Sequence, residues 1–160
     1  MIKKILFTGG GGVGNESIWK SLNKKYKLFF CDSNIESINP IIPKKNKITI
    51  CPVKSKNYLK QIKKIIDTKN IDLIVPGIDE ELLILKKNEK NLTNIFLPSL
   101  KNIKICNDKY EFSKFCKKND INTPKTSELN IKNIDIHNLK VILKPKLGRG
   151  SKGIFTSNNK

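Results

Sequence analysis

The chain has 160 residues and a formal net charge of +18, and its length suits one α/β domain with part of a second. With 38% hydrophobic residues, it can bury a core without disulfides or metals. No apolar run approaches the roughly 18 residues of a membrane span, and Ile5 to Phe7 is too short for the core of a signal peptide. We therefore expect a cytoplasmic protein without membrane contact.

The positive charge comes almost wholly from lysine, because Arg149 is the only arginine among 32 basic residues. Clustered cations would indicate nucleic-acid binding. These lysines are instead spread along the chain on the polar faces of predicted helices, without an arginine-rich stretch or an aromatic stacking motif. Alanine is absent while isoleucine and asparagine are abundant, a bias typical of an AT-rich genome. We expect no specific nucleic-acid partner.

The first hundred residues predict an open α/β domain. Five short apolar segments are expected to be strands, at 2–8, 27–31, 48–51, 71–75 and 95–97. Helices are predicted after the first, third and fourth of them, and a proline-containing loop after the second. We therefore expect residues 1–100 to form a Rossmann-like, mainly parallel sheet.

After about residue 100 the pattern changes. Asn107 or Asp108 is predicted to cap a helix, a strand is predicted over 140–144, and residues 156–160 are expected to fray.

The first glycine-rich segment has the spacing of a dinucleotide-binding loop. Gly9, Gly11 and Gly14 satisfy G-x-G-x-x-G between a strand and a helix, and Asp32 ends the next strand. Such glycines let backbone N–H groups approach a pyrophosphate, and the aspartate can accept from a ribose hydroxyl. A doubly wound sheet also needs a tight first turn for packing alone. An NAD(P)-binding module remains an alternative on this motif.

The second glycine-rich segment, residues 144–154, reads KPKLGRGSKGI. A strand lysine leads into it, and its glycines free backbone amides. Together with a serine hydroxyl and lysine ammonium groups, these amides can close over phosphates. The alternative at this loop is an exposed hairpin with incidental lysines.

Four motifs in this order resemble the ATP-grasp superfamily: VPGIDEEL at 75–82, NDK at 107–109, NDINTPKT at 119–126 and the run at 144–154. Within the superfamily, the chain is similar to short proteins that resemble the carbamoyl-phosphate synthase large subunit and the pyrrolysine-biosynthesis ligase. The resemblance implies a pre-ATP-grasp domain over residues 1–100. It also implies a linker helix and the first part of an incomplete α+β ATP-grasp domain over residues 101–160.

The resemblance further implies ATP and Mg²⁺ as cofactors. Such ligases phosphorylate a carboxylate or bicarbonate, and an amine then attacks the acyl phosphate. Lys109 matches a basic residue that reaches ATP phosphate, Lys144 matches the strand lysine on the α and β phosphates, and residues 148–153 match the lid loop. Lys146 and Lys152 stand where arginine is common, so point-charge contacts would replace bidentate ones. The implied ATP-binding residues are Lys109, Lys144, Lys146, Gly148, Arg149, Gly150, Ser151, Lys152 and Gly153.

By the same resemblance, one edge of the first domain faces the substrate site, and the residues on it are Gly10, Gly11, Gly12, Asp32, Asp79, Glu80 and Glu81. Asp79 is equally explained as a helix cap. The sequence identifies no catalytic residue and no metal ligand. Magnesium requires hard oxygen ligands, which relatives supply downstream of the lid loop. After Gly153 this chain has no Asp or Glu, only Asn158 and Asn159 in its tail.

We therefore expect the 160 residues to be a fragment, or a truncated or split gene product whose remaining part is a separate chain. Small carboxylate and amine molecules are the expected substrates. We expect that the chain by itself does not turn over ATP. A non-catalytic interaction remnant is a further alternative.

Overall fold

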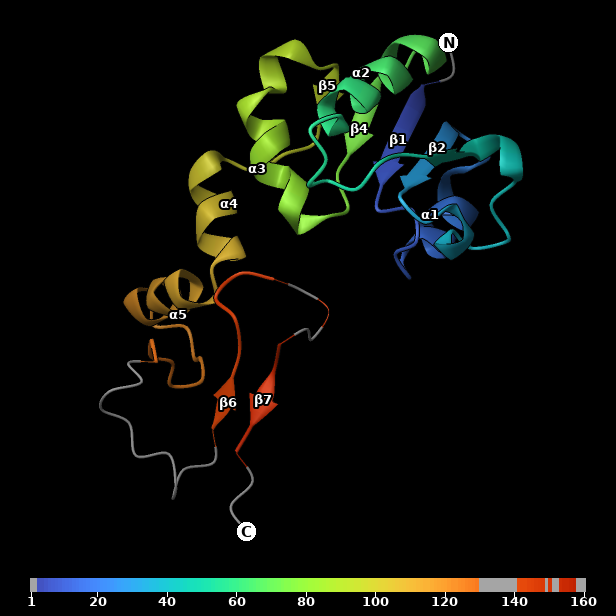
Figure 1. The fold of residues 1–160 in the computed structure, drawn as a ribbon. Coiled ribbons are helices and arrows are strands. Elements are labelled where there is room, and N and C mark those ends of the chain that lie inside the picture. Colours follow the sequence, from blue (N-terminus) through green and yellow to red (C-terminus); the bar gives the residue numbers. More distant parts are fainter. Residues whose placement is uncertain (1–2, 130–140, 149, 151–152, 158–160) are drawn as a thin grey trace. The chain divides into compact units, whose positions relative to one another are not determined.

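The computed structural model describes residues 3–129, 141–148, 150 and 153–157. The chain divides into two compact units, Met1–Pro98 and Ser99–Lys160. Figure 1 colours the first unit from blue to yellow and the second from yellow to red. Within the described residues, no helix has the length and apolar content needed to cross a membrane.

The first unit is built on a five-stranded sheet in which all neighbouring strands run parallel. The strands are β1 (Lys4–Thr8), β2 (Lys27–Asp32), β3 (Lys47–Thr49), β4 (Leu73–Val75) and β5 (Asn94–Ile95). Their order across the sheet is β3-β2-β1-β4-β5. The chain therefore runs from β1 through β2 to β3 at one edge of the sheet, and then crosses to β4 and β5 on the other side of β1. This arrangement confirms the predicted open, parallel α/β sheet.

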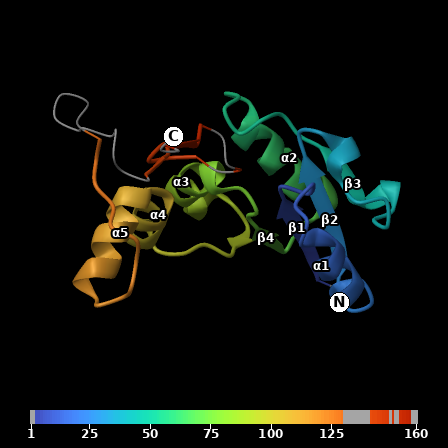
Figure 2. The ribbon, with the colours of Figure 1, turned by 90° about the horizontal axis from the view of Figure 1, so that it is seen from below.

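Alternate residues of the central strands build a separate core on each face of the sheet. On one face, Phe7 and Phe30 stack with ring centroids 5.1 Å apart, beneath α1 (Asn15–Leu22). On the other face, Leu6 packs beneath α2 (Tyr58–Lys69). Figure 2 shows α1 and α2 on opposite sides of β1 and β2. Because both faces are covered, only the two ends of the strands are left to meet a ligand.

The second unit begins with two helices, α4 (Leu100–Asn107) and α5 (Lys109–Lys118). Asp108 caps α5, as predicted, and its carboxylate accepts from the backbone N–H of Tyr110 at 2.9 Å. The sequence analysis missed α4, whose cap is Ser99. Leu100, Ile103 and Cys106 share one face of α4, but only Ile103 is buried, and a helix of eight residues shows too few apolar positions to establish a helical period.

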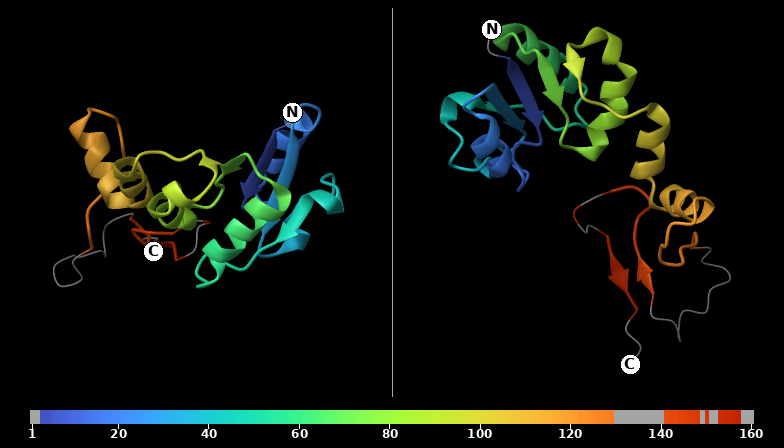
Figure 3. Two further views of the ribbon diagram at one scale, coloured as in Figure 1. Left: turned by 90° about the horizontal axis from the view of Figure 1, so that it is seen from above. Right: turned by 180° about the vertical axis from the view of Figure 1, so that it is seen from behind.

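The second unit continues with a pair of antiparallel strands, β6 (Ile142–Leu143) and β7 (Phe155–Thr156), visible in red in the right panel of Figure 3. The expectation that 156–160 fray is wrong at Thr156, which pairs with Ile142. In addition, Ser157 N donates to Val141 O at 3.0 Å. A local pattern cannot show this pairing, because the partner strand lies far away in the sequence. Residues 158–160 lie outside the described residues.

Candidate functional site

The strand order of the first unit identifies one end of the sheet as the candidate ligand-binding edge. Ligands of open α/β sheets bind beyond the carboxyl ends of the strands, where neighbouring strands connect in opposite directions. In this sheet that point lies between β1 and β4. Two segments leave the sheet there: the glycine loop after β1, and the turn Pro76–Gly77 that leads from β4 into α3 (Asp79–Lys87). Apart from Asp32, every predicted substrate residue lies on or directly after these two segments.

The glycine loop after β1 is held by its own hydrogen bonds. Gly10 N donates to Cys31 O at 2.9 Å, and Gly12 N donates to Gly9 O at 2.9 Å. The buried side chain of Asn15 donates to the carbonyls of Gly9 and Gly10 at 2.9 and 3.0 Å. Sequence analysis missed Asn15, although its place directly after the last glycine was a usable signal. Gly10 is buried and Gly12 exposed, so the far part of the loop is the part open to a ligand.

Asp32 fastens this loop to the end of β2. Its Oδ2 accepts from Gly11 N at 3.0 Å, and its Oδ1 accepts from Asn34 N at 3.0 Å. Gly11 has no room for a side chain, because a Cβ there would lie 2.2 Å from Ser37 Oγ. The structure thus places Asp32 beside the glycine loop and gives its carboxylate a role within the chain. A ribose hydroxyl, the partner expected in a dinucleotide-binding protein, would share these oxygens with two backbone N–H groups.

The two segments at this edge meet through glycine backbones. Gly9 has a φ of +61°, and a Cβ there would lie 2.9 Å from Ile78 Cγ1. A Cβ on Gly77 would lie 2.4 Å from Thr8 O. Larger residues would therefore force the segments apart. The close approach sets the end of β1 against the turn that precedes α3.

Glu81 lies beneath this contact and is fully buried, with 0% of its surface exposed. Its Oε1 accepts from the Thr8 hydroxyl, from Gly77 N at 3.1 Å and from Ile78 N at 3.0 Å. Its Oε2 accepts from the hydroxyl of Tyr58. The interpretation of Glu81 as a carboxylate that faces a substrate is therefore wrong, because burial removes it from the reach of a ligand. Instead, it joins the ends of β1 and β4 to the start of α2.

Asp79 and Glu80 are exposed on the first turn of α3, where negative charge suits the helix N-terminus. The residue at the cap position is Ile78. The carboxylate that returns to the backbone N–H of the cap residue belongs to Glu81. The alternative explanation of Asp79 as the helix cap is therefore not observed.

Burial raises the pKa of the Glu81 carboxyl above its ordinary value of 4.5, although hydrogen bonds from Thr8, Tyr58 and the backbone offset part of the effect. Burial, followed by the nearby charge of Glu81, likewise raises the pKa of Tyr58. Within the described residues, no ion pair includes Glu81. The folded state therefore favours the protonated carboxyl more than the unfolded state does.

We predict that the free energy of unfolding falls as the pH rises above 4.5, the ordinary pKa of this carboxyl. The stabilisation is fully present below that pH and is lost as Glu81 ionises in the folded state, with a slope of up to about 1.4 kcal/mol per pH unit. Glu81→Gln keeps the shape and removes the titration, so its stability should stay flat. Urea denaturation between about pH 5 and pH 8 measures this slope.

The exposed neighbour supplies the control, because Glu80→Gln should keep the slope of the unmodified chain. Glu16 and Asp108 have lowered pKa values, so their contributions are complete before this pH range and add no slope within it. Equal slopes in the Glu81→Gln variant and the unmodified chain would contradict the assignment.

In the second unit, the loop over 144–154 joins β6 to β7. Gly148, Gly150 and Gly153 have φ values of +123°, +66° and +71°, a region that favours glycine. Lys144 directly follows β6 and is exposed. The remaining predicted residues of this loop lie outside the described residues: Arg149, Ser151 and Lys152.

Lys109, the first residue of α5, donates three hydrogen bonds to this loop, one of them a long contact of 3.5 Å from its Nζ to Lys146 O. Its backbone N–H donates to Lys146 O at 3.0 Å, and its Nζ donates to Gly148 O at 2.8 Å. The structure therefore brings Lys109, Lys146 and the glycines together, although they are far apart in the sequence. This loop is attached to the first residue of α5, and its described glycines have positive φ values. A loop of this kind is suited to fold over a ligand.

The ammonium group of Lys146 already has acidic neighbours. Its Nζ lies 2.6 Å from Glu128 Oε1, 3.6 Å from Asp108 Oδ2 and 5.5 Å from the centre of the Tyr110 ring. The hydrogen bond to Glu128 raises the pKa of Lys146, and the charge of Asp108 adds to this. Burial opposes ionisation of Asp108, but backbone N–H donors and then Lys146 lower its pKa. Sequence analysis missed Glu128, a lone acid whose spacing carries no signal.

Comparison with protein families accounts for both units. The PylC-like N-terminal domain family matches residues 5–98, more than half of the chain, and the ATP-grasp domain family matches residues 106–160. The chain belongs to the PylC-like ATP-grasp family. The resemblance drawn from the four motifs is thereby confirmed, and the family is one of ligases. A comparison with curated proteins finds no match to this chain.

A solved structure supports the same fold. The crystal structure of N5-carboxyaminoimidazole ribonucleotide synthetase from Thermotoga maritima is similar to this PylC-like ATP-grasp chain, with a TM-score of 0.65 and 21% sequence identity. The match covers 99% of this chain and 42% of that chain. At this identity the likeness shows the fold alone. The chain spans less than half the length of that synthetase.

Proposed function

We propose that the second unit binds the phosphates of ATP, and that the protein is an ATP-dependent carboxylate–amine ligase. The observation that carries the proposal is the contact of Lys109 with the glycine-rich loop, to which Lys146 belongs. Two lysine ammonium groups in and beside a glycine-rich loop form a setting suited to a triphosphate. Further phosphate contacts are proposed for Lys144, Arg149, Ser151 and Lys152.

The proposed reaction has two steps. The γ-phosphoryl group of ATP is transferred to an oxygen of a carboxylate or bicarbonate, which yields an acyl phosphate and ADP. An amine then attacks the acyl carbon, loses a proton, and displaces inorganic phosphate. Lysine ammonium groups near the triphosphate offset its negative charge during transfer. The carboxylate and amine are proposed to bind at the candidate edge of the first unit, near Gly11, Gly12, Asp32, Asp79 and Glu80.

Magnesium, which the resemblance implies, does not fit the described residues. Mg²⁺ prefers several hard oxygen ligands, and the described part of the chain contains no group of three or more His, Cys, Asp or Glu side chains that could hold a metal ion. No step is therefore assigned to a residue that holds magnesium. We propose that residues beyond those described, in the same polypeptide or in a separate chain, complete the site.

We predict that Lys109→Met weakens binding of a non-hydrolysable ATP analogue by about tenfold or more, the size of one charge-assisted hydrogen bond. The substitution removes the proposed phosphate contact and the side-chain bond to Gly148 O, while the backbone bond from Lys109 N to Lys146 O remains. Lys118→Met removes the same charge from the exposed far end of α5 and should leave the affinity unchanged. Isothermal titration calorimetry on the full chain measures both, with NADH as a second ligand. Binding of NADH in place of the ATP analogue would favour the dinucleotide alternative.

We also predict that Glu128→Gln increases affinity for the ATP analogue, because phosphate then no longer competes with Glu128 for Lys146. Exposed ion pairs contribute about 0.2–1 kcal/mol, so an increase of about 1.5-fold to fivefold is expected. The matched control is Glu89→Gln, which breaks a similar pair with Lys86 at 2.6 Å in the first unit. Unchanged affinity in Glu128→Gln would argue against a phosphate contact by Lys146.

A further inference from the structure

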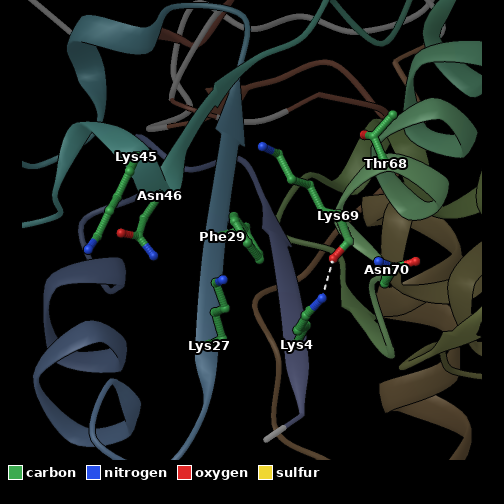
Figure 4. Close-up of a pocket in the computed structure, with 8 residues that line it drawn as sticks. All are labelled: Lys4, Lys27, Phe29, Lys45, Asn46, Thr68, Lys69 and Asn70. Carbon is green, nitrogen blue, oxygen red and sulfur yellow. Dashed lines mark hydrogen bonds between the residues drawn. The ribbon is translucent and has the colours of Figure 1, made fainter.

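The opposite edge of the first unit's sheet, at the amino ends of its strands, carries a cleft lined by lysines. Lys4 and Lys27 begin β1 and β2 and are paired in the register of these strands. Two adjoining cavities of about 290 and 450 Å³ share both lysines, together with Lys45 and Asn46. Figure 4 shows Lys4 and Lys27 between Lys45 on one side and Lys69 on the other. The cleft thus gathers cations from two strands, a short 3-10 turn and the end of α2.

The cations of this cleft have only neutral partners in the described part of its lining. Lys4 Nζ donates to Lys69 O at 3.0 Å, and Lys27 Nζ and Lys69 Nζ each lie 5.9 Å from the centre of the Phe29 ring. Within the described residues, neither cavity is lined by a carboxylate, and Lys24 and Lys25 add further cations to the second cavity. Asp72, beside the cleft, accepts from Lys4 N at 2.8 Å and lies 4.0 Å from Lys3 Nζ. Because neighbouring cations repel each other, an anion bound among them would be favoured.

Asn46, which lines both cavities, carries a buried acceptor without a partner. Asn46 has 7% of its surface exposed, and its Nδ2 donates to Leu28 O at 2.7 Å. That carbonyl can only accept, which settles the orientation of the amide. Its Oδ1 has no hydrogen-bond partner among the described residues. Such a group is unfavourable in a folded protein unless something satisfies it, and an N–H or O–H group of a ligand would do so.

We propose that this cleft binds a small phosphorylated molecule that carries a hydroxyl or amino group, such as a sugar phosphate. The lysines supply the charge for a phosphate monoester, and Asn46 Oδ1 accepts from the donor. A nucleic-acid backbone would meet the same lysines, but a pocket with one buried acceptor favours a small ligand with a donor at a defined place. The site lies at the other end of the strands from the candidate substrate edge and does not depend on the proposed ligase activity.

The test uses the full chain labelled with ¹⁵N and compares ribose 5-phosphate with methyl phosphate, which has the same charge and no hydroxyl. Ribose 5-phosphate should shift the NMR signals of the Asn46 side-chain amide saturably and bind at least about threefold more tightly than methyl phosphate. The double substitution Lys27→Gln with Lys69→Gln should weaken binding by about tenfold or more.

The matched control is Lys60→Gln with Lys63→Gln, which removes the same charge from exposed positions of α2 and should change the affinity by less than about twofold. Lys45→Gln, in a different segment, should also weaken binding and covers the case in which the double variant is unstable. The absence of a saturable shift, equal binding of methyl phosphate, or equal weakening by the control pair would each overturn the proposal. Tighter binding of a single-stranded oligonucleotide, lowered equally by both pairs, would overturn it as well.

Discussion

One buried carboxylate holds the candidate ligand-binding edge of the first unit in place. Glu81 accepts hydrogen bonds from the end of β1, the start of α2 and the turn before α3. No cation compensates it within the described residues, so these hydrogen bonds and the raised pKa of the carboxyl, which favours its neutral form, accommodate its burial. The glycine loop and the first turn of α3 therefore depend for their positions on a group that a ligand does not touch.

The two glycine-rich loops look alike in sequence and differ in their physical state. In the first loop, Asn15 binds the carbonyls and Asp32 binds a backbone N–H group, so the loop is largely satisfied from within. In the second loop, Lys109 provides an anchor while the glycines and Lys144 stay exposed. An anion would gain more from the second loop. This difference is consistent with the proposal that the second loop binds the phosphates of ATP.

The parallel sheet gives the first unit two chemically different edges. Because all five strands point the same way, their carboxyl ends collect Asp32, Asp79 and the glycine loop, whereas their amino ends collect Lys4 and Lys27. An antiparallel sheet would mix these groups at both ends. A single topology thus places the glycine loop with Asp32 and Asp79 at one end of the strands and the lysine-lined cleft, with Asp72 beside it, at the other.

The sequence by itself determined the fold class and the family. Apolar periodicity, glycine turns and ordered motifs are local features of the sequence, so they can be recognised without knowing how the side chains pack. The sequence also pointed to Lys109 and the loop over 144–154 as parts of an ATP-binding site, and that assignment stays a prediction. Only the tertiary structure separated Glu81 from Asp79 and Glu80, since three adjacent acids differ only in what packs around them. In the same way, the contact of Glu128 with Lys146 and the pairing of β7 with β6 arise between residues that are distant in the chain, and no local pattern encodes them.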